Sequence, residues 1–322
     1  MASFFELGLQ KHLGYENQLV KLDGLLDWSR FLDILKGVHK ESGPTGYCRL
    51  KMFKALLLGQ WHSLSDPALE QSLRVRLDFL QFTGFALGDN LPDETTFCRF
   101  RNKLVKQNKF EALLNEVNRQ LEAVGLKVKS ANTAIVDATI ITSNARPNKV
   151  LQPLDEQTTV LQYSADSDAR WLKKGKKSHF GYRAFTRCDE EGFIDKTNTK
   201  PANTAETKEL DTMTDGLAQG TRVLTDKGFF SAQNKEILKK KGLKNGLMYK
   251  AFANKPLTKN MYKFNKLVSK NRWRIEQCFG TLKRRFGYFR ASYFTTTKVD
   301  AQFKMKAICL NLLKALNKVH FA

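Results

Sequence analysis

Residues 133–141 (Thr-Ala-Ile-Val-Asp-Ala-Thr-Ile-Ile) constrain the fold of this chain more than any other stretch. They are β-branched and apolar almost throughout, which predicts a strand buried in a sheet. One carboxylate, Asp137, stands in the middle of that strand. Because a buried strand rarely holds an unpaired carboxylate, Asp137 is either a functional residue or the partner of a nearby arginine. We favour the functional interpretation.

Before this strand, residues 1–128 have the periodicity of helices. Apolar residues recur at helical spacing over 19–35, 50–60 and 110–124, and helices are expected to begin near Ser65 and Pro92. Cations are spread along this all-helical domain: Arg74, Arg76, Arg99, Arg101 and Lys103. Two consecutive short helices with basic residues could form a helix-turn-helix-like DNA reader. The alternative is a helical domain whose cations are solvated.

From Ser130 onward the pattern changes to that of an α/β domain covering residues 129–322. The expected order is three strands, a helix, a strand, a helix, a strand and then helices. Residues 143–165 are predicted to be a polar loop and residues 250–270 a basic loop insertion, and the last 25 residues form a closing amphipathic helix. This order predicts a sheet flanked by helices.

Two further carboxylates stand where the predicted elements would place a ligand. Asp226 ends the short apolar strand 222–226, and ligands usually bind at that end of a strand in α/β sheets. Its alternative role is a cap on the following helix. Glu276 lies in a helix predicted over 271–286, where 100° per residue puts it on the same side as Arg272 and Lys283. Taken alone, Glu276 would be an ordinary ion-pair partner of Arg272.

The charge balance restricts the class of partner. A net charge of +22 favours a polyanion, and nucleic acid rather than an anionic membrane. No run of about 18 apolar residues predicts a membrane span, and the first residues lack the pattern of a signal peptide. The five cysteines are scattered and never form a CxxC pair, which disfavours a zinc site or a disulfide framework and fits a reducing cytosol.

Three carboxylates on separate elements can converge at one edge of a sheet. Their oxygen atoms suit Mg²⁺ or Mn²⁺. Two such ions clamp a phosphodiester, one activating the attacking oxygen and the other stabilising the leaving oxygen. A strongly basic chain with three such acids is consistent with that chemistry, because metal ions reverse the local repulsion between carboxylates and phosphates.

Four motifs in order resemble the DDE transposases of bacterial insertion sequences, in the superfamily named for insertion sequences four and five. They are Val136-Asp137-Ala138-Thr139, Gly181-Tyr182-Arg183-Ala184, Thr225-Asp226-Lys227-Gly228-Phe229 and Arg272-x3-Glu276-x6-Lys283. The N-terminal segments 60–70 and 92–97 are similar to that group's helical domain. One departure is Ser269, where the family pattern has a tyrosine three residues before the arginine.

The resemblance implies an RNase H-like core with a mixed five-stranded sheet, after a helical DNA-binding domain. Asp137, Asp226 and Glu276 would be the catalytic metal ligands, holding Mg²⁺ or Mn²⁺, and we expect two ions. Arg272 and Lys283 match the family's basic residues beside the glutamate, which would hold transposon-end DNA or the geometry of the triad. The expected activity is strand cleavage at terminal inverted repeats followed by strand transfer into target DNA.

Further candidates for DNA contacts come from the basic segments. Lys176 and Lys177 lie in a basic turn with Trp171, which could grip phosphates or be a solvated loop. The other candidates are Lys227, Arg274, Arg284, Arg285 and His179, although a structural hydrogen bond is an alternative for His179. The expected partner is double-stranded DNA, and a homodimer would pair two transposon ends. The alternative functions are a catalytically silent DNA-binding protein and a general RNase H-like nuclease.

Overall fold

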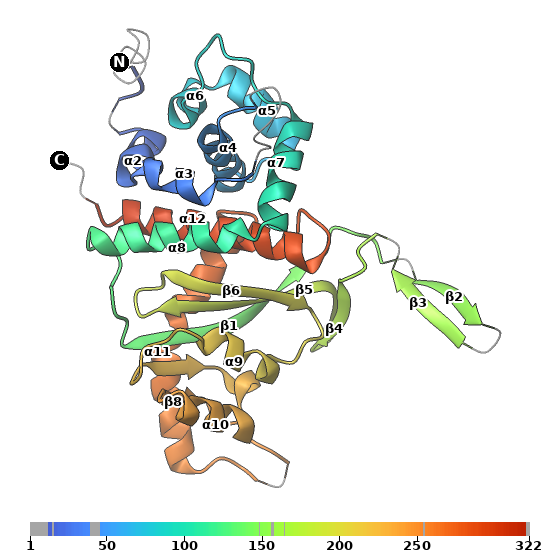
Figure 1. The fold of residues 1–322 in the computed structure, drawn as a ribbon. Coiled ribbons are helices and arrows are strands. Elements are labelled where there is room, and N and C mark those ends of the chain that lie inside the picture. The colour runs from blue at the N-terminus through green and yellow to red at the C-terminus, as the bar shows by residue number, and fades with distance from the viewer. Residues whose placement is uncertain are drawn as a thin grey trace. The chain divides into compact units, whose positions relative to one another are not determined.

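A computed structural model describes residues 12–14, 16–38, 46–147, 149–155, 158–163, 165–253 and 255–319 of the chain (Figure 1). It divides into two compact units, one formed by residues 1–127 and 304–322 and the other by residues 128–303. The sequence predicts a single α/β domain over residues 129–322. The last residues instead group with the helical unit, because the closing helix packs its second part there.

The first unit is helical. Its helices are α2 (Gln18–Leu25), η1 (Trp28–Arg30), α3 (Phe31–Ile34), α4 (Arg49–Trp61), α5 (Asp66–Val75), α6 (Leu77–Thr83), α7 (Glu94–Lys106) and α8 (Lys109–Ala123). Helix α4 is buried along most of its length, from Met52 to Trp61. The side chains of Ser65 and Asp93 accept hydrogen bonds from backbone N–H groups and so cap α5 and α7. The segment after Ser65 forms two helices, α5 and α6, since Arg76 between them is extended.

Three of the cations along this unit have partners within it. Arg101 donates two hydrogen bonds to Asp66, at 2.7 and 2.8 Å. Arg74 pairs with Glu70, and Arg76 pairs with Asp78. These arginines therefore support the helical fold, and the prediction that the unit reads DNA rests on its other basic residues.

The second unit is built on a mixed sheet. Its strands are β1 (Thr133–Thr142), β4 (Arg170–Lys174), β5 (Lys177–Asp189), β6 (Ile194–Pro201), β7 (Arg222–Thr225) and β8 (Lys244–Leu247). Strand β5 is long enough to pair with β4 through its first part and with β6 through its second part, so the strands occupy five positions across the sheet. β1 is antiparallel to β5 and parallel to β7, and β7 is parallel to β8. This is the RNase H-like fold that the sequence predicted.

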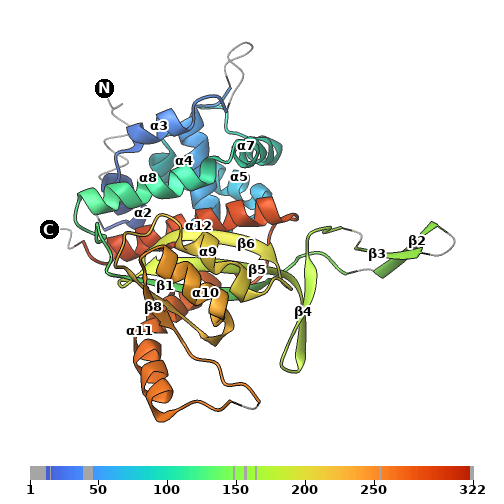
Figure 2. The same ribbon diagram turned by 60° about the horizontal axis from the view of Figure 1, so that its bottom comes forward.

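Helices cover both faces of the sheet (Figure 2). On one face, α9 (Leu210–Thr214) and α10 (Ala232–Lys240) enclose a core that includes Val136, Phe185 and Phe229. The other face is covered by the long helix α11 (Lys259–Arg284), which packs against β1 and β7. Alternate residues of β1 point to opposite faces, so Val136 enters the core and Asp137 faces α11.

Three segments differ from the prediction. Residues 143–165 are not only loop, because β2 (Lys149–Asp155) and β3 (Thr158–Tyr163) form a separate two-stranded antiparallel sheet. The basic turn before His179 contains β4, which pairs with the start of β5. The prediction of a basic loop was wrong for residues 259–270, which form the first turns of α11. Thr258 caps that helix. Asn265 and Val268 are buried on one side of it, although the segment contains many lysines.

The closing helix α12 (Thr296–Leu316) contributes to both units. In the α/β unit its first part stacks Phe303 on Tyr288 with ring centroids 4.9 Å apart. In the helical unit the Asn311 side chain donates a hydrogen bond to Asn118 at 2.7 Å. Across the described residues, no helix is long and apolar enough to cross a membrane.

Candidate active site

Asp137 lies within β1, and Asp226 directly follows the adjacent parallel strand β7. The register of β1 and β7 aligns Thr133 with Arg222 and ends at Ile135 with Leu224. Each aspartate follows its strand's last aligned residue by two positions. Both carboxylates therefore stand on the same face, toward the carboxyl ends of the strands, where α/β sheets usually bind ligands.

Arg272 reaches this pair from α11. Its Nη2 donates a hydrogen bond to Asp137 Oδ2 in an ion pair whose side chains are only 10% and 15% exposed. Its Nη1 contacts the sulfur of Met248 at 3.8 Å. The family resemblance predicts that Arg272 holds either DNA or the geometry of the triad, and an ion pair with Asp137 is the contact that the second role requires.

Arg272 does not fully neutralise the negative charge of the two aspartates. The pKa of Asp137 is raised from 3.8 to about 6. Burial is the main cause, Arg272 opposes the shift, and the Asp226 charge adds to it. Asp226 accepts a hydrogen bond from the backbone N–H of Gly228 at 2.8 Å and caps the short turn η3 (Lys227–Phe229). Two carboxylates that repel each other in a largely buried place are a donor set that fits a divalent cation.

A third carboxylate, Glu206, lies beside the pair and was missed from the sequence. It belongs to the short turn η2 (Glu206–Lys208), and its Oε1 accepts a hydrogen bond from Arg183 Nη1 at 3.2 Å. Burial and the charges of Asp226 and Asp137 raise its pKa. A glutamate in a polar connection gives no pattern by itself. The signals that could have led to Glu206 are its neighbours Arg183 and Gly228, which lie in two of the motifs that resemble the family.

Glu276 is not part of this cluster. It is exposed on α11, one helical turn beyond Arg272. Among the described residues no group of three or more His, Cys, Asp and Glu side chains is arranged to hold a metal ion. The structure therefore brings together two of the three expected ligands and leaves Glu276 on the exposed side of the helix.

Comparison with known proteins identifies the class of this chain. Residues 129–312 match the family of transposase DDE domains, and residues 8–103 match the transposase domain family DUF772. The chain belongs to the DDE transposase family. The family's transposition chemistry is the activity of this enzyme, and members of the family typically use divalent metal ions.

This transposase is similar to the transposase for insertion sequence element IS1106 from Neisseria meningitidis serogroup B. The two are 40% identical over 286 residues, which cover 88% of this chain and 96% of the relative. Among solved structures, a piggyBac transposase synaptic complex with hairpin DNA covers 97% of this chain and 74% of its own, at 10% identity and a TM-score of 0.44. A Mos1 transposase paired-end complex covers 81% of this chain and 87% of its own, at 12% identity and a TM-score of 0.22.

The recognised motif 181–184 of the transposase has a structural basis at three of its positions. A Cβ on Gly181 would lie 2.2 Å from the carbonyl oxygen of Ile141, so only glycine allows β5 to approach β1 there. The Tyr182 hydroxyl donates a hydrogen bond to the buried carboxylate of Asp166. Arg183 holds Glu206.

The other predicted contact residues lie on two elements of the transposase and beside Asp226. Trp171, Lys176, Lys177 and His179 belong to the β4–β5 hairpin, where the Trp171 ring packs 5.4 Å from Phe180. Lys283, Arg284 and Arg285 lie at the end of α11; burial and the charge of Lys174 lower the pKa of Lys283. Lys227 is exposed next to Asp226.

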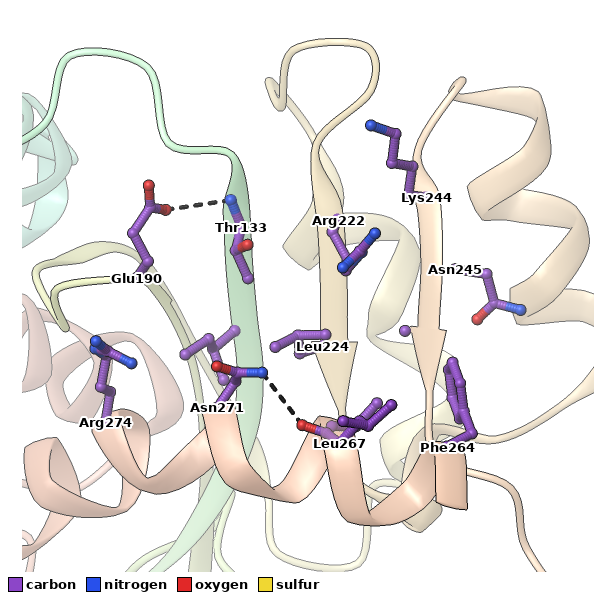
Figure 3. Close-up of a pocket in the computed structure, with 13 residues that line it drawn as sticks. Thr133, Glu190, Arg222, Leu224, Lys244, Asn245, Phe264, Leu267, Asn271 and Arg274 are labelled. Atoms are coloured by element: carbon purple, nitrogen blue, oxygen red, sulfur yellow. Dashed lines mark hydrogen bonds between the residues drawn. The ribbon is translucent and has the colours of Figure 1, made fainter. Parts of the chain in front are cut away.

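Arg274 lines a groove of about 470 Å³ between α11 and the beginnings of β1, β7 and β8 (Figure 3). Arg222 and Lys244 face each other across β7 and β8, and both line the same groove. Within the described part of the chain, these three cations pair with no carboxylate. Glu190 also lines the groove, and its carboxylate accepts hydrogen bonds from the backbone N–H groups of Asn132 and Thr133. Three cations and one carboxylate leave the groove with a net positive charge, which favours an anion.

Proposed function

We propose that this transposase binds the terminal inverted repeats of its insertion sequence and cuts and joins DNA there. Asp137, Asp226 and Glu276 would hold Mg²⁺ or Mn²⁺, with two ions in the complete site. The observation that carries the proposal is that Asp137 on β1 and Asp226, directly after the neighbouring parallel strand β7, are close enough for the charge of one to raise the pKa of the other. Glu276 is included because it matches the family motif through Arg272 and Lys283.

The protein's own residues would prepare the site for the metal. When bound, the ions would supply a deprotonated attacking oxygen and stabilise the leaving oxygen. Arg272 orients Asp137 and favours its ionised form, which is the form that binds a cation. The Asp226 carboxylate is fixed by its hydrogen bond from Gly228.

DNA would be held by basic side chains of the α/β unit, together with His179 and Trp171. Lys176, Lys177 and Trp171 of the hairpin, His179, and Lys227 beside Asp226 are proposed backbone contacts. On α11 the proposed contacts are Lys283, Arg284 and Arg285 at its end, and Arg274 with Arg222 and Lys244 in the groove. Such contacts give affinity without reading sequence, because they neutralise phosphates. The inverted repeats and the target would both be double-stranded DNA, and a homodimer would pair two ends.

The test is strand cleavage of end-containing DNA with Mg²⁺. Asp226→Asn should lower the cleavage rate at least about 100-fold, because the substitution removes a ligand charge at the metal. Glu236→Gln, at an exposed position of α10, is the matched control and should cut at the wild-type rate. Normal cleavage by Asp226→Asn would exclude the proposed triad.

The same assay separates the alternative functions. A silent DNA-binding protein would bind the ends and show no cleavage or strand transfer with Mg²⁺ or Mn²⁺. A general nuclease would cut unrelated DNA or an RNA–DNA hybrid as readily as the ends. Preference for end-containing DNA, followed by joining to a second molecule, supports the proposal over both.

A further inference from the structure

The Glu206 carboxylate occupies the space that a side chain on Gly228 would need. A Cβ built on Gly228 would lie 1.6 Å from Glu206 Oε2 and 3.0 Å from Asp226 Oδ1. The two carboxylate oxygens are therefore no farther apart than those distances combined. Residue 228 must be glycine for Glu206 to reach Asp226 in this way.

The cation that holds Glu206 does not neutralise Asp226. Arg183 donates to Glu206 Oε1, the oxygen that faces away from Gly228, and Arg272 donates to Asp137. In the part of the chain that the structure describes, Asp226 has no Lys or Arg partner. Each arginine thus neutralises a different carboxylate, Glu206 or Asp137, and the uncompensated charge lies between Asp226 and Glu206. These two form a pair and not a group of three, which no described residues make.

We propose that Glu206 is a further carboxylate of the metal site and holds a divalent cation together with Asp226. This inference rests on the proposed function, because it requires a metal at Asp137 and Asp226. A solely structural ion pair with Arg183 would not need the second oxygen of Glu206 to contact Gly228. Lysine or arginine at the open side of Asp226 would also serve a solely structural cluster, and none is there among the described residues.

Binding of Mn²⁺ alone to the full chain, followed by electron paramagnetic resonance, tests the inference without DNA or turnover. Glu206→Gln keeps the shape and removes the charge, and it should weaken Mn²⁺ binding at least tenfold. Glu236→Gln should bind as the wild type does. An unchanged Mn²⁺ affinity in Glu206→Gln, with binding lost in Asp226→Asn, would overturn the inference and leave the proposed function intact. Unchanged binding in Asp226→Asn and Asp137→Asn would contradict the proposed function itself.

Gly228→Ala tests the same geometry without altering a charge. The added methyl group would displace the end of the flexible Glu206 side chain, a shift that the fold can accommodate. We expect weaker Mn²⁺ binding with little change in melting temperature. Gly88→Ala is the control, since a Cβ there meets nothing within 4 Å. Full Mn²⁺ affinity in a folded Gly228→Ala protein would count against the inference, and if that variant does not fold, Glu206→Gln decides.

Discussion

Arg272 donates a hydrogen bond to Asp137 although the two residues are 135 positions apart in the chain. The contact joins the central strand of the sheet to the helix that carries Glu276. It also explains how a buried strand tolerates a carboxylate, since the charge has a partner of opposite sign. The pairing with an arginine, one of the two interpretations of Asp137 from the sequence, is therefore observed, and its role as a metal ligand stays a prediction.

Removal of the arginine should destabilise the metal-free protein. Arg272→Met leaves the Asp137 carboxylate buried without its partner, and we expect a loss of about 3–5 kcal/mol in the free energy of unfolding. Denaturant unfolding at neutral pH measures this loss. In an Asp137→Asn background the same substitution should cost clearly less, because no charge is left unpaired. Equal costs in the two backgrounds would show that the ion pair does not account for the effect.

The stability of the metal-free protein should depend on the ionisation of Asp137. Its pKa is raised from 3.8 to about 6 on folding, so between these pH values the folded state binds more protons than the unfolded state. The contribution of Asp137 to the free energy of unfolding therefore falls as pH rises through this range and stays low above it. Unfolding curves of wild type and Asp137→Asn, measured with a chelator from about pH 4 to 7, isolate this contribution.

The difference between the two proteins is the informative quantity, since other carboxylates also change their ionisation on folding. The pKa of Glu206, for example, is raised by burial and by neighbouring charges, so its contribution to stability also falls as pH rises. The stability of Asp137→Asn relative to wild type should increase with pH up to about 6 and then level off. A difference that is independent of pH would contradict the raised pKa.

Substitution of Gly181 should disrupt the central pair of strands. An alanine Cβ would lie 2.2 Å from Ile141 O and 2.7 Å from Ser143 N. Both are backbone atoms, which cannot move away without a shift of the strand. We expect Gly181→Ala to lower the free energy of unfolding by about 3 kcal/mol or more, within the range of severe steric substitutions. Gly88→Ala, measured in the same way, should change it little. A melting temperature equal to that of wild type would mean that β1 and β5 can separate at this point without cost.

The cationic groove should contribute to DNA affinity in a salt-dependent way. If Arg222 contacts one phosphate, Arg222→Gln should weaken binding of unrelated and end-containing DNA equally. It should also reduce the slope of log affinity against log salt by about 1. Filter binding at several salt concentrations measures both quantities. Lys239→Gln, at an exposed position of α10, is the matched control, and identical slopes for all three proteins would exclude the groove.

The sequence predicted the parts of the fold that depend on local pattern. The β-branched run around Asp137, the capped helices at Ser65 and Asp93, and the short strand before Asp226 all form where their residues favour them. The prediction of a loop was wrong for residues 259–270. The segment is rich in lysine and has few buried residues, so its sequence lacks the apolar periodicity of a helix. The motifs also led to the DDE transposase family, since four short patterns in order are specific although each alone is not.

The sequence by itself determined the class of enzyme, the RNase H-like sheet and the identity of its proposed acids. Only the tertiary structure decided which side chains meet. Arg272 lies on Asp137, Glu206 reaches Asp226 over Gly228, and Glu276 remains exposed. Local pattern reports the conformation of neighbouring residues, whereas these contacts depend on strand register and on how one helix crosses the sheet. Both are set by packing between segments far apart in the chain.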